Sequence, residues 1–302
     1  MTKKQVAVIG FGRLGMACAA AVRDDEHCRL AGVVRRPQGV AAGLPDEFAQ
    51  VPVVSHVSEL KQVDVALVCV PTEQARGVAH DLLQHRIAVV DCVDLHGDDM
   101  RRHKAALDKV AVHHHCSAVV GAGWDPGALS LFRELFALLT PKGHTDLRHR
   151  SGVQLHHTTL AGDIPGVHDL VAMQQPGPAG VLQRYVYVEL ADGADAAQVE
   201  AAIKADPLWT GEEVLVFPVD SVAALVDEDH GILIERRGTA AGVDHQLLLL
   251  EARFSEAALS AQVMLAAARL LPAQQHRALS LFDIPPAALW GELSDQAEQA
   301  WL

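Results

Sequence analysis

Short apolar runs alternate with stretches of helical spacing along the first part of the chain. The runs are rich in Val and bounded by Gly, Pro or charged residues, as is typical of buried strands, and the stretches between them repeat apolar residues as amphipathic helices do. We expect strands at 5–9, 28–34, 63–70, 87–91 and 118–120, and helices at 16–23, 73–84 and 128–139. Buried strands that alternate with helices predict an α/β fold with a doubly wound parallel sheet of the Rossmann type.

The pattern changes after Pro141. Strand-like segments then dominate, which predicts a second domain of the α+β class. We expect its strands at 186–190, 214–219, 231–236 and 246–254, with helices at 196–204 and 256–271. Because the last helix can return to cover the first domain, we divide the chain into a first domain of residues 1–121 and 255–302 and an inserted second domain of residues 122–254.

Composition narrows the class of protein. Of 302 residues, 50% are hydrophobic and 21% are charged, which indicates a well-packed globule. The formal net charge of −13 argues against a nucleic-acid partner. The five cysteines are odd in number and contain no C-x-x-C pair, as in reduced cytosolic proteins. Since we find no signal peptide and no apolar segment long enough for a membrane span, we expect a cytoplasmic protein without a membrane partner.

A glycine-rich turn joins the first expected strand to the first expected helix. Gly10, Gly12 and Gly15 match the dinucleotide-binding pattern, in which glycines allow a tight turn, a close approach of the pyrophosphate and close helix–strand packing. The helix N-terminus, at Arg13 and Leu14, supplies backbone amides for the anion. A purely structural turn is the alternative, but the position at the first junction of a βαβ unit favours cofactor binding.

The end of the second expected strand bears on the choice between the two nicotinamide cofactors. An acidic residue there would bind the ribose hydroxyls of NAD, whereas this chain has Arg35 and Arg36. Two guanidinium groups can bind a 2′-phosphate, so we predict NADP, with an ordinary solvated basic pair as the alternative. We also assign to the cofactor site the segment where the next apolar run stops, Cys69, Val70, Pro71 and Thr72.

Two carboxylates follow expected strands of the parallel sheet. Asp94 comes after the strand at 87–91, and Asp125 lies in the turn after the strand at 118–120. Ligands of open α/β sheets bind beyond the carboxyl ends of the strands. Paired carboxylates there suit a cationic amino substrate, because they can hold its ammonium group and help remove its proton before hydride transfer. Aspartate is also a common turn residue, so a structural role stays open for each.

At this point the chain resembles the meso-diaminopimelate dehydrogenase family, particularly its shorter form. The likeness runs almost end to end, and its most specific element is Gly123-Trp-Asp-Pro-Gly127. The other matching segments are Gly10-Phe-Gly-Arg-Leu-Gly15, Cys69-Val-Pro-Thr72, Asp91-x-x-Asp94-x-His96, Ile164-Pro-Gly-Val167 and His230-Gly-Ile-Leu-Ile-Glu-Arg236.

The resemblance implies an activity and a set of roles. It implies a homodimeric, NADP-dependent enzyme that reversibly deaminates the D-centre of a diamino diacid to a keto acid and ammonia. Asp94 and Asp125 would contact the reacting amino centre, and Trp124 would line the pocket. Arg184 would bind the distal carboxylate, and His230 would be a further substrate ligand. Without the family, Arg184 is read as a strand-end surface charge and His230 as a satisfied, partly buried histidine. The first domain would then bind NADP, and the second would bind substrate and form the dimer.

The chain departs from the family in the expected substrate pocket. A Gly-Pro-Gly-Met-Ser-Met-Gly-His loop of the family corresponds to 150–157 here, where only Gly152 and His157 match. A family Thr is replaced by Gln174, and a family Asn by His245. Larger side chains would reshape the far end of the pocket, so meso-diaminopimelate or a related amino acid is the substrate hypothesis.

The sequence bears on two other functions and on a metal site. Oxidoreductases of sugars or other hydroxy compounds on a similar frame carry a Glu-Lys-Pro signature, which is replaced here by Asp91-Cys-Val-Asp94. A non-catalytic NADP sensor would explain the altered loop, but retention of Asp94 and Asp125 argues against it. His113-His114-His115 invites a metal hypothesis; we expect a solvated connection instead, because consecutive strand side chains alternate faces and would not surround one ion.

Overall fold

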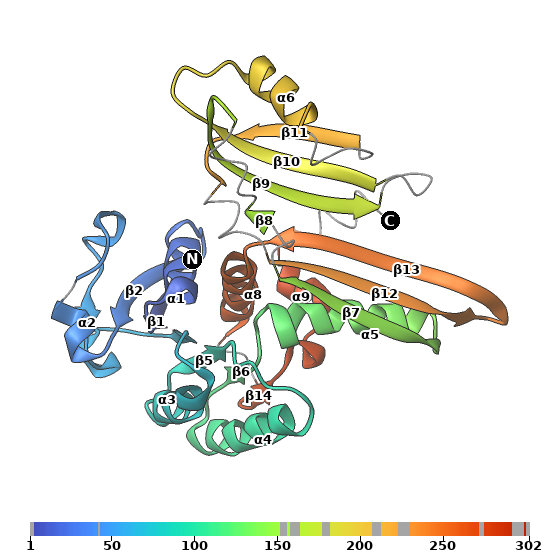
Figure 1. Cartoon of the computed structure of the whole chain (residues 1–302). Coiled ribbons are helices and arrows are strands. Elements are labelled where there is room, and N and C mark those ends of the chain that lie inside the picture. Colours follow the sequence, from blue (N-terminus) through green and yellow to red (C-terminus); the bar gives the residue numbers. More distant parts are fainter. Residues whose placement is uncertain are drawn as a thin grey trace. The chain divides into compact units, whose positions relative to one another are not determined.

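The computed structural model of the chain describes residues 3–41, 43–151, 156–157, 164–176, 182–206, 213–222, 230–271, 275–291 and 299. The chain divides into two compact units, and Figure 1 labels their elements. The first unit consists of Met1–Gly143, Thr239–Val243 and Glu256–Leu302, and the second of His144–Gly238 and Asp244–Ser255.

A seven-stranded parallel sheet forms the centre of the first unit, within its described residues. Its strands are β1 (Lys4–Ile9), β2 (Cys28–Val34), β3 (Val53–Val54), β4 (Val65–Val68), β5 (Ala88–Asp91), β6 (Ala118–Val119) and β14 (Ala278–Leu279). They lie in the order β14-β6-β5-β4-β1-β2-β3, which is the order of a doubly wound sheet. The prediction of a Rossmann-type fold is therefore confirmed.

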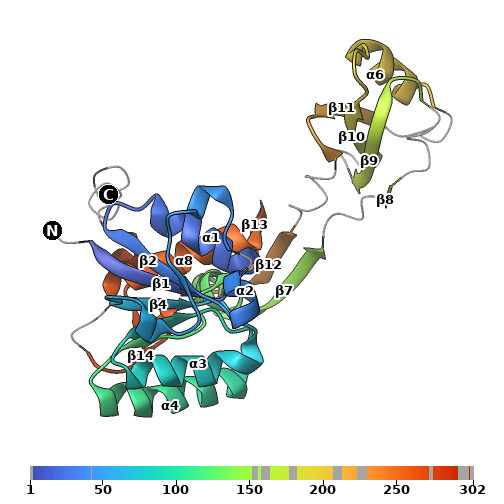
Figure 2. The ribbon, with the colours of Figure 1, turned by 90° about the vertical axis from the view of Figure 1, so that its left-hand side faces the viewer.

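Helices cover both faces of this sheet. Figure 2 shows α1 (Arg13–Arg23) and α8 (Glu256–Leu270) on one face and α3 (Thr72–Gln84) and α4 (Gly97–His114) on the other. Strand β4 and the first three residues of β5 are apolar on both faces because both faces are covered. Shorter elements of the unit are α2 (Pro37–Ala41), α9 (Pro286–Trp290), η1 (Asp46–Phe48), η2 (Val57–Glu59) and η7 (Leu281–Asp283).

Helix α4 corrects one expectation. His113 and His114 form its last residues, and His115 ends it in the left-handed conformation with a φ of 52°. The expected solvated connection before β6 is therefore wrong for His113 and His114. Consecutive side chains of a helix point in different directions around its axis, so these histidines would still not surround one metal ion.

The segment after β6 belongs to the first compact unit. It contains the turn η3 (Trp124–Ala128) and the helix α5 (Leu129–Leu139). The Ala122 amide donates to the Asp91 carbonyl at 2.8 Å, and the Trp124 amide donates to Ser260 Oγ on α8 at 3.0 Å. Because of these bonds, the compact unit runs past residue 121, where the sequence division was drawn. The assignment of cofactor, substrate and dimerisation to particular domains stays a prediction.

The described residues of the second unit form two sheets. One has the order β11-β10-β9-β8 and is covered by α6 (Ala196–Lys204), whose Val199 and Ile203 pack with Leu170, Val186 and Val188. Its strands are β8 (His156–His157), β9 (Val167–Pro176), β10 (Leu182–Leu190) and β11 (Glu213–Val219). The other, of order β13-β12-β7, consists of β7 (Lys142–Ser151), β12 (His230–Ala240) and β13 (Val243–Phe254).

Candidate active site

The glycine turn between β1 and α1 has no room for side chains at two of its three glycines. Gly10 has a φ of +92°, and a Cβ there would lie 2.6 Å from the Cys69 carbonyl oxygen. A Cβ on Gly15 would lie 2.2 Å from the Gly10 carbonyl oxygen, so α1 packs directly on the turn. A Cβ on Gly12, in contrast, would meet no heavy atom within 4 Å. The turn therefore presents bare backbone to open space at Gly12.

This open position lies at the N-terminus of α1. Gly12 is the residue before the helix, and no side chain caps it. The first helical amides, those of Arg13 and Leu14, have no partner one turn earlier within the helix and carry the positive end of its dipole. An uncapped helix start beside a bare backbone turn fits the pyrophosphate of a dinucleotide.

The arginines after β2 differ in their surroundings. Arg35 is half-buried: its Cζ lies 5.7 Å from the centroid of the Phe11 ring, and its Nη1 donates to the Gly43 carbonyl at 2.6 Å. A Cβ on Gly39 would lie 2.9 Å from Arg35 Nε, so this glycine leaves room for the guanidinium. Arg36 is exposed. The Phe11 ring thus holds the Arg35 guanidinium beside the glycine turn, where a cofactor phosphate could reach it.

The segment after β4 connects the cofactor turn with the first candidate carboxylate. Cys69 Sγ lies 3.6 Å from Cys18 Sγ, and this hydrogen bond, together with burial, raises the pKa of the Cys69 thiol well above its usual value. Burial likewise raises the pKa of Cys92 to about 12. Both thiols are therefore protonated at neutral pH. Thr72, which begins α3, accepts a hydrogen bond through Oγ1 from the Asp94 amide at 3.2 Å.

Asp94 and Asp125 follow neighbouring strands, since β5 pairs with β6 in parallel register. The Asp94 side chain is 81% exposed, and its Oδ1 lies 3.2 Å from His96 Nε2. The Asp125 side chain is only 16% exposed, and its two oxygens lie 3.3 and 3.5 Å from Nη1 and Nη2 of Arg133 on α5. One carboxylate is thus open to solvent, while the other is held by a guanidinium.

Arg133 is a site residue that sequence reasoning missed. Its position on the helix after the Asp125 turn carries no motif, and only the folded turn brings the two side chains together. Trp124, beside Asp125, is buried, with its ring centroid 6.3 Å from that of Phe132. Asp125 and Trp124 therefore both lie beside α5. Asp91 and His103, a buried pair beneath the same loops, were also missed.

The other expected substrate residues lie in the second unit. Arg184 of β10 stands opposite Gln174 of β9, so the structure brings these two positions together. His157 of β8 stands opposite Val171. His230 begins β12, whereas His245 follows closely after the turn that joins β12 to β13, so these two histidines stand at opposite ends of the hairpin and are not brought together. Gly152 lies outside the described residues.

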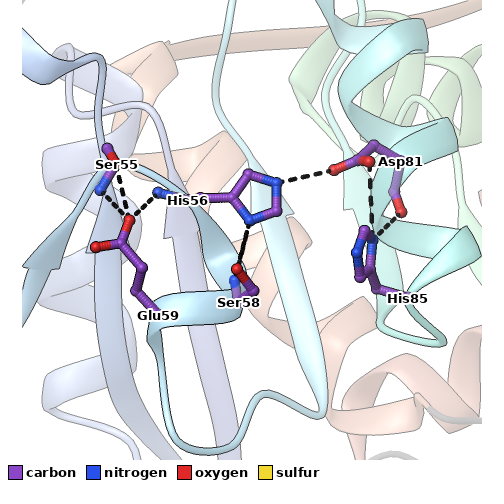
Figure 3. Close-up of polar contacts among 6 residues, drawn as sticks. All are labelled: Ser55, His56, Ser58, Glu59, Asp81 and His85. Atoms are coloured by element: carbon purple, nitrogen blue, oxygen red, sulfur yellow. Dashed lines mark hydrogen bonds and ion pairs between the residues drawn. The ribbon is translucent and has the colours of Figure 1, made fainter.

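Another cluster of titratable groups lies near the C-terminal end of α3, shown in Figure 3. His56 Nδ1 accepts a hydrogen bond from the Ser58 amide at 3.3 Å, and its Nε2 lies 3.6 Å from an oxygen of Asp81. His85 Nδ1 lies 2.8 Å from the Asp81 carbonyl. Of these contacts, the one between His56 and Asp81 links the start of η2 to α3. Among the residues that the structure describes, no group of three or more potential ligands could hold a metal ion, and no helix is long and apolar enough to cross a membrane.

The fold and the glycine turn, with two carboxylates beyond neighbouring strands, fit the class of Rossmann-type oxidoreductases. Comparisons with known proteins agree. The meso-diaminopimelate D-dehydrogenase of Bacteroides fragilis is 34% identical over 94% of this chain and 94% of its own. That of Corynebacterium glutamicum is 26% identical over 98% of both chains. This chain belongs to the meso-diaminopimelate D-dehydrogenase family, and the predictions of that family and of an oxidoreductase acting on CH–NH2 donors are confirmed.

Solved structures show the same fold. Diaminopimelate dehydrogenase of C. glutamicum in complex with diaminopimelate superposes with a TM-score of 0.63 over 100% of both chains, at 24% identity. An engineered D-amino acid dehydrogenase bound to NADP+ also gives 0.63 over 100% of both chains, at 23% identity. A family profile described as CoA binding domain matches residues 1–94, which run from β1 to the Asp94 loop.

Proposed function

We propose that the protein is an NADP-dependent amino acid dehydrogenase that deaminates a D-amino centre reversibly, with meso-2,6-diaminopimelate or a related amino acid as substrate. The observation that carries the proposal is the placement of Asp94 and Asp125 beyond the neighbouring strands β5 and β6, in the same unit as the glycine turn. The 34% identity to a meso-diaminopimelate D-dehydrogenase supports the same reaction.

The surroundings of Arg35 support NADP as the cofactor. A guanidinium held by Phe11 and the Gly43 carbonyl is preorganised for a phosphate, and no acidic residue stands at the end of β2 to bind ribose hydroxyls. Gly12 and the first amides of α1 would bind the pyrophosphate. Coenzyme A also contains a diphosphate, so the match to a CoA binding domain makes it the ligand against which NADP is tested.

The bound nicotinamide would accept hydride from the α-carbon of the substrate. Asp94, open to solvent, can bind the substrate ammonium and accept its proton, since an amine must be neutral before its α-carbon loses hydride. Water then adds to the resulting imine and ammonia leaves. The balanced reaction converts amino acid, NADP+ and water to keto acid, NADPH, ammonium and one proton. Asp125, held by Arg133, can orient the amino group.

The pairing of Arg184 with Gln174 supports a substrate with a second polar end. A guanidinium can bind a distal carboxylate through two hydrogen bonds, as the family resemblance implies. Where the family has Thr, Gln174 adds a larger amide to that position. We therefore infer that the site for the distal group of the substrate is one place where this chain differs from its relatives, in addition to the altered loop at 150–157.

A homodimer is the proposed assembly. Helix α5 exposes Phe132, Leu135, Leu138 and Leu139, which repeat along one side of the helix, and Leu138 is 77% exposed. An apolar stripe of this kind on a helix surface is typical of a protein–protein contact. The stripe is the surface that we assign to a second copy of the chain.

The test is a turnover assay with NADP+ over a panel of D-amino and diamino acids, paired with reductive amination of keto acids in ammonia. We expect NADPH formation with at least one D-amino acid, and its loss in Asp94→Asn and Asp125→Asn. Asp98→Asn, which removes another exposed carboxylate just beyond the Asp94 loop, is the matched control and should keep full activity. Tight NADPH binding without turnover on any amino or hydroxy substrate would contradict the enzyme and favour a sensor, and binding of coenzyme A in preference to NADPH would contradict the cofactor.

A further inference from the structure

A buried, hydrogen-bonded pair of side chains lies beneath the loops that carry Asp94 and Asp125. Asp91, the last residue of β5, is 0% exposed, and His103 of α4 is 1% exposed. His103 Nε2 lies 2.8 Å from Asp91 Oδ2 and donates to the carboxylate. Burial of charged or titratable side chains costs free energy, so such a pair inside an apolar sheet calls for an explanation.

The other oxygen of Asp91 connects the two loops. Asp91 Oδ1 accepts from the Gly121 amide at 2.8 Å and from the Val93 amide at 3.4 Å. Val93 directly precedes Asp94, and Gly121 opens the loop that leads to Asp125. One carboxylate thus binds the starts of both loops, while His103 fixes its orientation from the opposite side.

Further hydrogen bonds hold the two loops close to Asp94 and Asp125. The Asp94 amide donates to Thr72 Oγ1, and the Trp124 amide, next to Asp125, donates to Ser260 Oγ. The first loop is therefore held by two of these groups and the second by three, since the Ala122 amide also donates to the Asp91 carbonyl at 2.8 Å. The Asp91 carboxylate is the acceptor that both loops share. If it rotates, the Val93 and Gly121 amides lose this acceptor, and the separation of the loops is less tightly fixed.

We propose that Asp91 and His103 are positioning residues, which set the separation of Asp94 and Asp125 through the two loop amides. This inference rests on the proposed function, because it takes those two carboxylates as the groups that bind the substrate amine. The hydrogen bond of His103 goes to Asp91, so His103 acts through that residue.

The test compares two amides at position 103. His103→Gln places an N–H group about where Nε2 lies, whereas His103→Asn is one methylene shorter and cannot reach Asp91. We expect kcat per bound cofactor to fall about 10- to 100-fold in His103→Asn, because a displacement of about 1 Å at a reacting centre has an effect of this size. His103→Gln should recover most of the loss. The Kd for NADPH, measured by fluorescence titration, should stay near the wild-type value in both.

Leu107→Ala is the matched control. Leu107 is buried on α4 like His103, and its truncation weakens helix packing without removing the bond to Asp91. It should lower the unfolding midpoint and leave kcat per bound cofactor unchanged. An equal loss of kcat in Leu107→Ala, or no recovery in His103→Gln, would overturn the proposal in favour of a merely structural pair.

Amide exchange gives a second readout that needs no activity. In His103→Asn the amides of Val93 and Gly121 should exchange faster with solvent deuterium, and in His103→Gln they should exchange as in wild type. Unchanged exchange in His103→Asn overturns the positioning role even if the wild type turns over no amino acid. If the wild type shows no turnover but the two amides exchange faster in His103→Asn, the proposed function is contradicted, while the positioning of the loops by Asp91 and His103 stands.

Discussion

Replacement of Arg35 by Ala should weaken the binding of NADPH without changing the binding of NADH. The guanidinium is held by the Phe11 ring and by the Gly43 carbonyl, so its remaining N–H groups are preorganised for the 2′-phosphate that NADH lacks. Hydrogen bonds to charged groups contribute about 1.5–3 kcal/mol. Because Arg35 is only half-buried and solvent screens part of its charge, the lower end applies, about 1.5–2 kcal/mol, which is about a 10- to 30-fold rise in Kd.

The assay is a fluorescence titration of each reduced cofactor at two salt concentrations. Arg29→Ala is the matched control: it removes the same charge from the exposed start of β2, about 20 Å from Arg35 along the strand. It should leave both Kd values unchanged. Phe11→Ala should give a smaller, about two- to fivefold, rise for NADPH, the size of a solvent-exposed cation–π contact. Equal losses for NADPH and NADH in Arg35→Ala, or an equal effect of Arg29→Ala, would refute 2′-phosphate recognition by Arg35.

Three further predictions concern the fold and its assembly. Gly15→Ala should destabilise the protein by about 1–3 kcal/mol in urea unfolding, because the new Cβ would overlap the Gly10 carbonyl. The control Gly77→Ala, in open space within α3, should stabilise the protein by up to about 1 kcal/mol. A Gly15→Ala variant more stable than wild type would refute the tight packing of α1 on the turn. Burial would raise the pKa of Asp25, but hydrogen bonds from Arg269 and from the backbone outweigh burial and lower this pKa. The ionised carboxylate therefore stabilises the fold at pH values above its unfolded pKa. This stabilisation is lost as the pH falls through the pKa of the folded state. Asp25→Asn should therefore cost about 2–4 kcal/mol at pH 7 and much less in acid, and a loss independent of pH would contradict this. Leu138→Glu on α5 should yield monomers in sedimentation, and an unchanged mass would exclude this surface.

The features that could be predicted best from the sequence are those formed by residues close together along the chain. The strand, glycine turn and helix from β1 to β2 are consecutive, and the turn needs glycine at Gly10 and Gly15 because of contacts within that short segment and with Cys69. The parallel sheet followed from the same alternation. Asp94 and Asp125 could be placed at one edge because both follow buried strands.

Contacts between distant segments could not be predicted. The pairing of Asp91 with His103 and of Asp125 with Arg133 depends on how α4 and α5 turn against the loops, and one charged residue among many on a helix carries no signal. Strands β7 and β9 were not predicted, because their polar residues, such as those of His144–Asp146, mask the alternation. Helix α4 was not predicted, and the three consecutive histidines at its end have neither helical nor strand periodicity.

The most direct test of the central claim is the stoichiometry of a single reaction. Purified protein is mixed with NADP+ and meso-2,6-diaminopimelate, or with the best amino acid of the panel, and NADPH, ammonia and keto acid are quantified together. We expect equal amounts of the three products, with none formed by the Asp94→Asn variant. NADPH formation without ammonia, or tight NADP+ binding with no product from any D-amino acid, would contradict it.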